Sequence, residues 1–214
     1  MDMINYIKNC FGMFMFSKEA FDKIIKKATF KLAFLSFLLV YFSSLIINSI
    51  LEGVKDPLYT IVEMVGGTLI LALVMIFLFF IFASIVHIIF RILKAKGTYL
   101  DTVRGFLSTS IVPVIISFPF VLLMTIFHQE NIFFGIIGFI GFIIFIGLYI
   151  YSIIVEITLF SKMHGISQGQ SALGVLLGYF IIFLLVIAIL AILFFIFVSL
   201  IGGFDALELL LADL

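Results

Sequence analysis

Apolar residues fill five long stretches of the chain that contain no lysine, arginine, aspartate or glutamate. Each stretch lies between two charged residues: Lys31 to Glu52 (20 residues), Glu63 to Arg91 (27), Arg104 to Glu130 (25), Glu130 to Glu156 (25) and Lys162 to Asp205 (42). A bilayer core of roughly 30 Å needs about 20 apolar residues in a helix, so each stretch can span it. Because hydrocarbon offers no partner to an exposed backbone, helix is the expected structure. The pattern predicts an all-α integral membrane protein.

The five predicted spans cover residues 32–51, 65–93, 103–127, 133–160 and 171–201. Before the third span, Gly97 suits a left-handed turn, and Thr98 with Asp101 should form a capping box that starts the next helix. The last stretch should form one long, tilted helix, because residues 179–198 contain no glycine or proline that would favour a turn. Pro113 and Pro119 should kink or break the third span, since each removes a backbone donor. We expect hydroxyls nearby to satisfy the freed carbonyls: Ser108, Thr109 and Ser110.

Composition and charge set the class of protein and its orientation. The chain is 65% hydrophobic and 11% charged, whereas a soluble domain carries about 25% charged residues. With the N-terminus inside, 11 of the 12 basic residues lie on the inner side and Lys55 alone lies outside. Basic residues in short loops stay cytoplasmic, so we predict five spans with a cytoplasmic N-terminus and an external C-terminus. Residues 202–214 would then form a short acidic external tail, after a membrane domain of residues 30–201.

Residues 1–29 are expected to form an amphipathic cytoplasmic or interfacial segment of one or two helices. Ser17 is a plausible N-cap. The apolar side would consist of Phe14, Phe16, Phe21, Ile24 and Ile25, and the basic side of Lys18, Lys23, Lys26 and Lys27. Such a segment could lie on anionic lipid or dock a soluble partner.

The segment HIIFRILKAKGTYLDTVRGFLSTSIVP, residues 87–113, resembles the Yip1 domain family. In that family a histidine and an arginine end the second span. A basic, glycine-containing loop follows, and then a helix with an arginine, a small polar residue and a proline. The matching positions on the expected cytoplasmic face are His87, Arg91, Gly97, Arg104, Ser110 and Pro113, together with His164 and Gly165 before the last span. The resemblance covers roughly residues 16–200.

The resemblance implies a five-span protein with its N-terminus inside. Eukaryotic members bind Rab-type GTPases and one another in vesicle trafficking. This chain lacks their long polar N-terminal region and their Asp-Leu-Tyr-Gly-Pro-like segment, so the resemblance gives little support for GTPase binding. The short N-terminus resembles the prokaryotic branch, which implies the cell membrane, or an internal membrane in a eukaryotic cell.

Two ionisable residues lie inside predicted spans at similar depth, His87 and Glu156, and they could form a polar pair. Intramembrane ionisable residues usually face the bundle interior and are candidates for function. Three interpretations stay open: a structural clasp with a nearby basic residue (Arg91, Arg104 or Lys162), a site for an ion, a proton or a lipid headgroup, and a metal site shared with His164. No His-x-x-x-His spacing supports a metal, so we expect neither metal nor cofactor.

No motif for catalysis is present, since Gly-x-Ser-x-Gly, His-Glu-x-x-His and a phosphate-binding loop are all missing from the sequence. We therefore expect a non-catalytic membrane scaffold or adaptor that organises protein partners or lipid at the cytoplasmic face. The alternative is a channel or transporter component with its polar site at His87 and Glu156, and a third hypothesis is lipid or curvature sensing by the N-terminal segment. Glycines at 135, 138 and 141 and at 174 and 178 should pack helices or form a homo-oligomer face. We expect no nucleic-acid partner.

Overall fold

In the computed structural model, residues 1–55, 61–126 and 132–201 are described, and they form seven α-helices. The helices are α1 (Met3–Phe14), α2 (Lys18–Lys27), α3 (Phe30–Lys55), α4 (Ile61–Ile92), α5 (Tyr99–Ile126), α6 (Ile132–His164) and α7 (Gln168–Ile201). Each of the five predicted spans is helical over its described residues, apart from Leu93, and the last span, residues 171–201, is one unbroken helix, as predicted. The described residues contain no strand.

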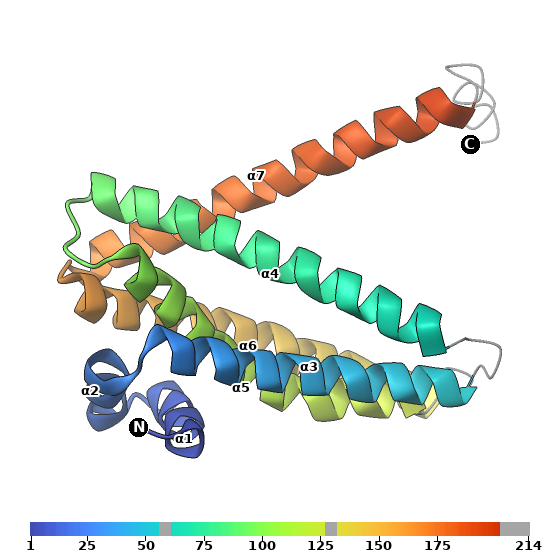
Figure 1. The fold of residues 1–214 in the computed structure, drawn as a ribbon, viewed down its shortest axis with the longest axis horizontal. Helices are drawn as coiled ribbons and strands as arrows, with labels where there is room; N and C mark the ends of the chain where they lie inside the picture. The colour runs from blue at the N-terminus through green and yellow to red at the C-terminus, as the bar shows by residue number, and fades with distance from the viewer. Residues whose placement is uncertain (56–60, 127–131, 202–214) are drawn as a thin grey trace.

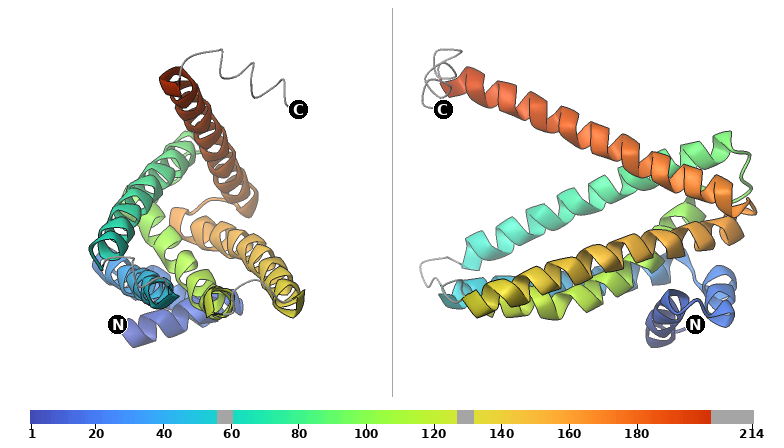
Figure 2. Two further views of the ribbon diagram at one scale, coloured as in Figure 1. Left: turned by 90° about the vertical axis from the view of Figure 1, so that its right-hand side faces the viewer. Right: turned by 180° about the vertical axis from the view of Figure 1, so that it is seen from behind.

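The five long helices form two groups. Helices α3, α5 and α6 lie side by side. Helices α4 and α7 pack on each other near the end that holds α1 and α2, and they diverge from each other towards the other end, where α4 approaches α3 and α7 points away from the bundle (Figure 1). Helix α4 also contacts α3 and α5, and α7 contacts α6. The two further views show the same divergence from the side and from behind (Figure 2).

Three helices carry apolar stretches long enough to cross a membrane among the described residues: Tyr99–Ile116, Phe139–His164 and Gln168–Phe197. The apolar stretches described in α3 and α4 are shorter, Phe30–Ser43 and Ile76–Ile92. The expected acidic tail, residues 202–214, lies outside the described residues.

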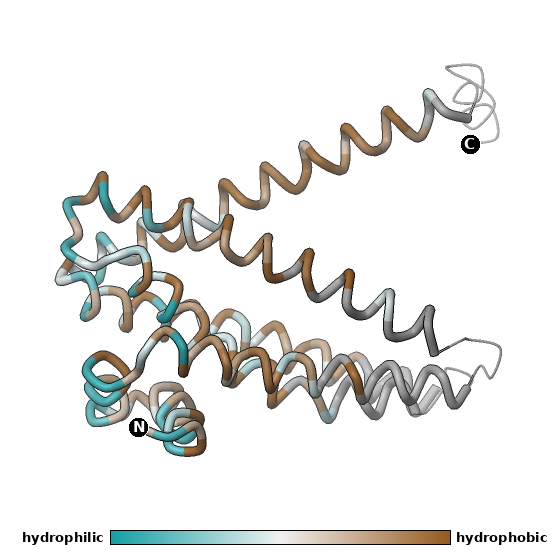
Figure 3. The backbone as a smooth tube through the Cα atoms, in the orientation of Figure 1, coloured by the Kyte–Doolittle hydropathy of each residue, from teal (hydrophilic) through white to brown (hydrophobic). Residues whose placement is uncertain are grey.

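Hydrophilic residues gather at one end of the molecule (Figure 3). This end, called the polar end below, consists of α1, α2, the loop 93–98 between α4 and α5, and the turn 165–167 between α6 and α7. Three segments far apart in the sequence therefore meet on one side of the apolar bundle.

Local sequence signals define how the helices begin and end at the polar end. Thr98 and Asp101 form the expected capping box of α5, because the Thr98 amide donates to Asp101 Oδ2 (2.9 Å) and the Asp101 amide donates to Thr98 Oγ1 (3.2 Å). Helix α6 ends on Gly165, whose φ of 63° is in the left-handed region that suits glycine, and the Ile166 amide then bonds back to the Ser161 carbonyl (3.2 Å).

The left-handed turn after α4 is not at Gly97, where the sequence suggested it. Lys94 takes the positive φ, 60°, and the amide of Ala95 closes the turn on the carbonyl of Phe90 (2.9 Å). Gly97 is buried and lies against the ring of His164, with which a Cβ atom would overlap. Packing, rather than backbone conformation, therefore explains this glycine.

Helix α5 runs unbroken through Pro113 and Pro119. The three hydroxyls before Pro113 do not reach the Thr109 carbonyl that this proline leaves free. Ser108 and Ser110 donate one turn back along the helix, to the carbonyls of Arg104 and Phe106, and the Thr109 hydroxyl lies 3.2 Å from the carbonyl of Gly105. A serine or threonine side chain in a helix reaches the carbonyl four residues before it, which explains why the expected compensation does not form.

The two glycines early in α7 bring that helix close to α4. Gly174 lies against the Phe90 ring and Gly178 lies against Val86, so that a Cβ atom at either glycine would overlap its neighbour. Small residues allow this approach, and here they serve packing within the chain. Gly135 and Gly138 lie where no side-chain environment is described.

Candidate functional site

Helices α1 and α2 fold back on the bundle and bury the apolar side expected for lipid. Ser17 caps α2 as predicted, since its hydroxyl accepts the Ala20 amide (3.4 Å). Phe14, Phe21 and Ile24 are buried, whereas Phe16 stays 46% exposed. The expected face is thus largely covered by protein, because α1 contacts α3, α5 and α6, and α2 contacts α6.

Four contacts fix this N-terminal pair to the bundle. Tyr6 of α1 bonds to Ser108 of α5 (2.7 Å); since the Ser108 hydroxyl already donates to a carbonyl, Tyr6 is the donor. Tyr151 of α6 donates to the carbonyl of Phe14. The other two contacts run from Arg104 Nη1 to the carbonyl of Ala28 (2.7 Å) and from Lys162 Nζ to the ring of Phe21 (4.4 Å from its centroid).

Burial of α1 against the bundle changes the acidity of two of its side chains, Cys10 and Tyr6. It raises the pKa of the Cys10 thiol to about 12, and desolvation also raises the pKa of Tyr6. A thiol with this pKa is almost entirely protonated near neutral pH and is a poor nucleophile. Cys10 is therefore a core residue of the N-terminal pair.

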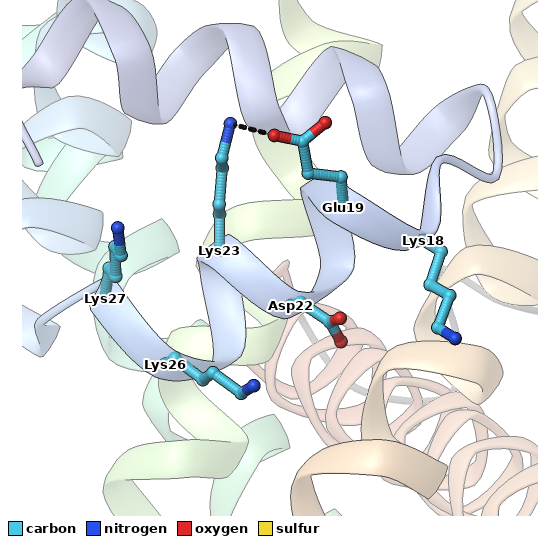
Figure 4. Close-up of a pocket in the computed structure, with 6 residues that line it drawn as sticks. All are labelled: Lys18, Glu19, Asp22, Lys23, Lys26 and Lys27. Atoms are coloured by element: carbon cyan, nitrogen blue, oxygen red, sulfur yellow. Dashed lines mark ion pairs between the residues drawn. The ribbon is translucent and has the colours of Figure 1, made fainter.

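The outer side of α2 carries six charged side chains, which Figure 4 shows: Lys18, Glu19, Asp22, Lys23, Lys26 and Lys27. Glu19 Oε1 pairs with Lys23 Nζ at 2.6 Å, and this contact lowers the pKa of Glu19. Such an exposed pair adds little stability. Four lysines against two acids leave this surface with a positive balance, and Arg91, Lys94 and Lys96 are exposed near the loop 93–98.

A buried threonine joins two of the predicted site residues. Thr102 Oγ1 lies 3.1 Å from His87 Nδ1 and 3.1 Å from His164 Nε2, and both Thr102 and His164 are fully buried. One hydroxyl donates only one proton, so at least one histidine must donate to it. Nδ1 of His164 has no hydrogen-bond partner. A proton on Nε2 makes Nδ1 an unused acceptor, which costs less than burying an unpaired N–H.

His87 and Glu156 do not form the predicted pair. Glu156 is 3% exposed and accepts hydrogen bonds from Thr109 (3.1 Å) and Tyr179 (3.0 Å). His87 and Glu156 each bind a threonine of α5, but Thr102 and Thr109 are separated by about 10 Å of helical rise. Aromatic rings pack between these two levels, with Phe82 and Phe160 4.6 and 4.7 Å from Phe106, centroid to centroid.

The remaining predicted site residues lie apart from the hydrogen bonds that join His87, Thr102 and His164. Arg104 pairs with Asp101 (2.8 Å) as well as with Ala28, and Ser110 and Pro113 lie together on α5, where they line the cavity described below. Arg91 and Gly165 are exposed. Among the residues that the structure describes, no three histidine, cysteine or acidic side chains are grouped to bind a metal ion.

Sequence reasoning missed Thr102, Gly105, Thr109 and Tyr179 as site residues. Gly105 is buried against the ring of Phe160, much as Gly97 is buried against His164. A signal was present, because Thr98, Thr102, Gly105 and Thr109 recur at intervals of three or four residues and so share one face of α5. Helix α6 and His87 of α4 pack on this face of α5.

These features define an all-helical protein with apolar helices long enough to cross a membrane and a buried polar cluster where its helices meet. The Yip1 domain family model matches residues 11–191, and the chain belongs to this family. It is thus a membrane protein of the Yip1 family, as the resemblance in residues 87–113 indicated. No curated protein and no solved structure matches the chain.

Proposed function

We propose that the protein is a non-catalytic membrane scaffold or adaptor that crosses the cell membrane five times and presents its polar end to the cytoplasm. The observation that supports this function best is the fixed position of the N-terminal pair. Arg104 donates to the carbonyl of Ala28, which ends α2, and Tyr151 donates to the carbonyl of Phe14 in α1, so the lysines of α2 stay on the outside. A rigid, positively charged surface of this kind suits an acidic protein segment or anionic lipid.

The alternative, a channel or transporter component, has less support. It needs a shared polar site, but His87 and Glu156 have different partners about 10 Å apart along α5. The long helices are also dominated by apolar side chains. A polar path across the bilayer would require more hydrophilic lining than these residues offer.

The orientation can be measured by labelling single cysteines in intact cells with a membrane-impermeant maleimide. In a Cys10→Ala background, we expect Ala212→Cys to react and Lys94→Cys to react only after the membrane is permeabilised. The reason is the 11-to-1 distribution of basic residues between the two sides. Equal reactivity of both cysteines in intact cells would contradict five spans.

The scaffold role can be tested by placing a photo-crosslinking amino acid at Lys26 in the full chain. We expect cross-links to one reproducible protein partner, and we expect Lys18→Glu together with Lys23→Glu to reduce their yield at least five-fold, because the positive balance of the α2 surface would be reversed. The matched control is Lys8→Glu on α1, also exposed, which should leave the yield unchanged. Cross-links to lipid alone, or a yield unaffected by the reversal, would contradict a protein scaffold.

A further inference from the structure

An apolar cavity of about 480 Å³ lies between the five long helices. Each helix contributes lining residues, among them Tyr41 of α3, Phe79 of α4, Ser110 of α5, Glu156 of α6, and Tyr179 and Ile182 of α7. Pockets for small organic ligands have volumes of roughly 300–1,000 Å³ and combine apolar walls with a few polar groups. The cavity fits that description.

The cavity opens to the side of the bundle. Several residues that line it are partly exposed: Leu78 by 37%, Phe145 by 46% and Tyr149 by 44%. They belong to α4 and α6, within the apolar parts of these helices. A surface of this kind faces hydrocarbon when a helix crosses a bilayer, so an apolar chain can enter the cavity directly from the membrane.

Glu156 gives the cavity one strongly polar point. Its two carboxylate oxygens each accept one hydrogen bond, from Thr109 and from Tyr179. A carboxylate can accept about four hydrogen bonds, so each oxygen has capacity for one more. The lining contains no lysine, arginine or histidine among the described residues. An anionic group would meet no compensating charge there, whereas a hydroxyl or an amine could donate to Glu156.

We propose that this cavity holds the apolar chain of a membrane lipid whose polar end donates a hydrogen bond to Glu156 and carries no net negative charge. Two sources share this chemistry, the free hydroxyl of a diacylglycerol and the amine of a long-chain amine. Helical rise places Glu156 about 12 Å before His164 at the polar end, a depth that a lipid chain anchored near the interface can span. The proposal is independent of the scaffold role, because the cavity and the α2 surface share no residue.

The proposal can be tested by native mass spectrometry of the full chain in phosphatidylcholine nanodiscs. Dioleoylglycerol, octadecylamine and oleate at pH 8 are the probes. We expect one molecule of dioleoylglycerol or octadecylamine to bind at least ten-fold more tightly than oleate. The better of these two probes identifies the hydroxyl or the amine as the natural donor. Binding of oleate as tight as that of both other probes would overturn the proposal.

Two matched substitutions locate the site. Ile182 lines the cavity and its neighbour Ile181 does not, so Ile182→Trp should weaken binding at least ten-fold and Ile181→Trp should leave it unchanged. In Glu156→Gln, the preference for dioleoylglycerol or octadecylamine over oleate should fall to less than three-fold. The amide lacks the negative charge of the carboxylate and has one acceptor fewer. If Glu156→Gln does not fold, the comparison at residues 181 and 182 still decides. Equal binding by both tryptophan variants would overturn the proposal.

Discussion

Replacing Gly105 with alanine should lower the free energy of unfolding by about 1–3 kcal/mol, the usual cost of overpacking a core. A Cβ atom at this position of α5 would overlap the ring of Phe160 on α6. That ring cannot easily move, because Phe90, Phe106 and His164 surround it with centroids 5.4, 4.7 and 5.9 Å away. The strain must therefore separate α5 from α6. Unfolding in mixed micelles of increasing dodecyl sulfate content measures the change.

Gly147→Ala is the matched control. Gly147 also lies inside a long helix, but a Cβ atom there would have no neighbour within 4 Å. We expect this variant to be as stable as the original chain or more stable by up to about 1 kcal/mol, because alanine has the higher helix propensity. Equal free energies of unfolding for Gly105→Ala and Gly147→Ala would contradict the close approach of α5 to α6 at Phe160.

The sequence predicted the helices of this protein better than their contacts. The apolar stretches were long and lacked charge, so helix was the expected structure for each, and the structure contains all five. Apolar residues occur on all sides of these helices, so hydrophobic periodicity could not indicate which face of a helix meets a neighbour, although small and polar residues mark one face of α5. His87 and Glu156 illustrate the consequence. Counting residues placed them at similar depth, but in the structure they bind threonines about 10 Å apart along α5 and so have different partners.

Local signals were reliable where they involved neighbours in sequence. The caps formed by Ser17, and by Thr98 with Asp101, were predicted from spacing alone and are present. Gly97 was misread because a glycine in a loop can serve either a turn or a close contact, and only the position of His164 distinguishes the two. In the same way, the apolar side of residues 1–29 was predicted, but whether lipid or protein covers it depends on the distant contacts of Tyr6 and Arg104.

Arg104→Ala should release the N-terminal pair from the bundle. The guanidinium donates to the Ala28 carbonyl (2.7 Å) and pairs with Asp101 (2.8 Å), and it therefore links α5 to the residue that ends α2. Ala28 is 3% exposed, so its carbonyl would lose a charged donor in a largely dry environment. Hydrogen bonds to charged groups contribute about 1.5–3 kcal/mol, which corresponds to an increase of about ten-fold or more in the open population.

Cys10 reports this opening, because it is fully buried in α1 and its pKa is raised to about 12. It should react slowly with a maleimide in the folded protein at pH 7.5, and opening exposes the thiol and returns its pKa towards the ordinary value. We therefore expect labelling at least ten-fold faster in Arg104→Ala. Arg91→Ala removes an exposed arginine at the end of α4 and should leave the rate unchanged. Equal rates in both variants would mean that the N-terminal pair is held without Arg104, which would remove the basis for a fixed α2 surface.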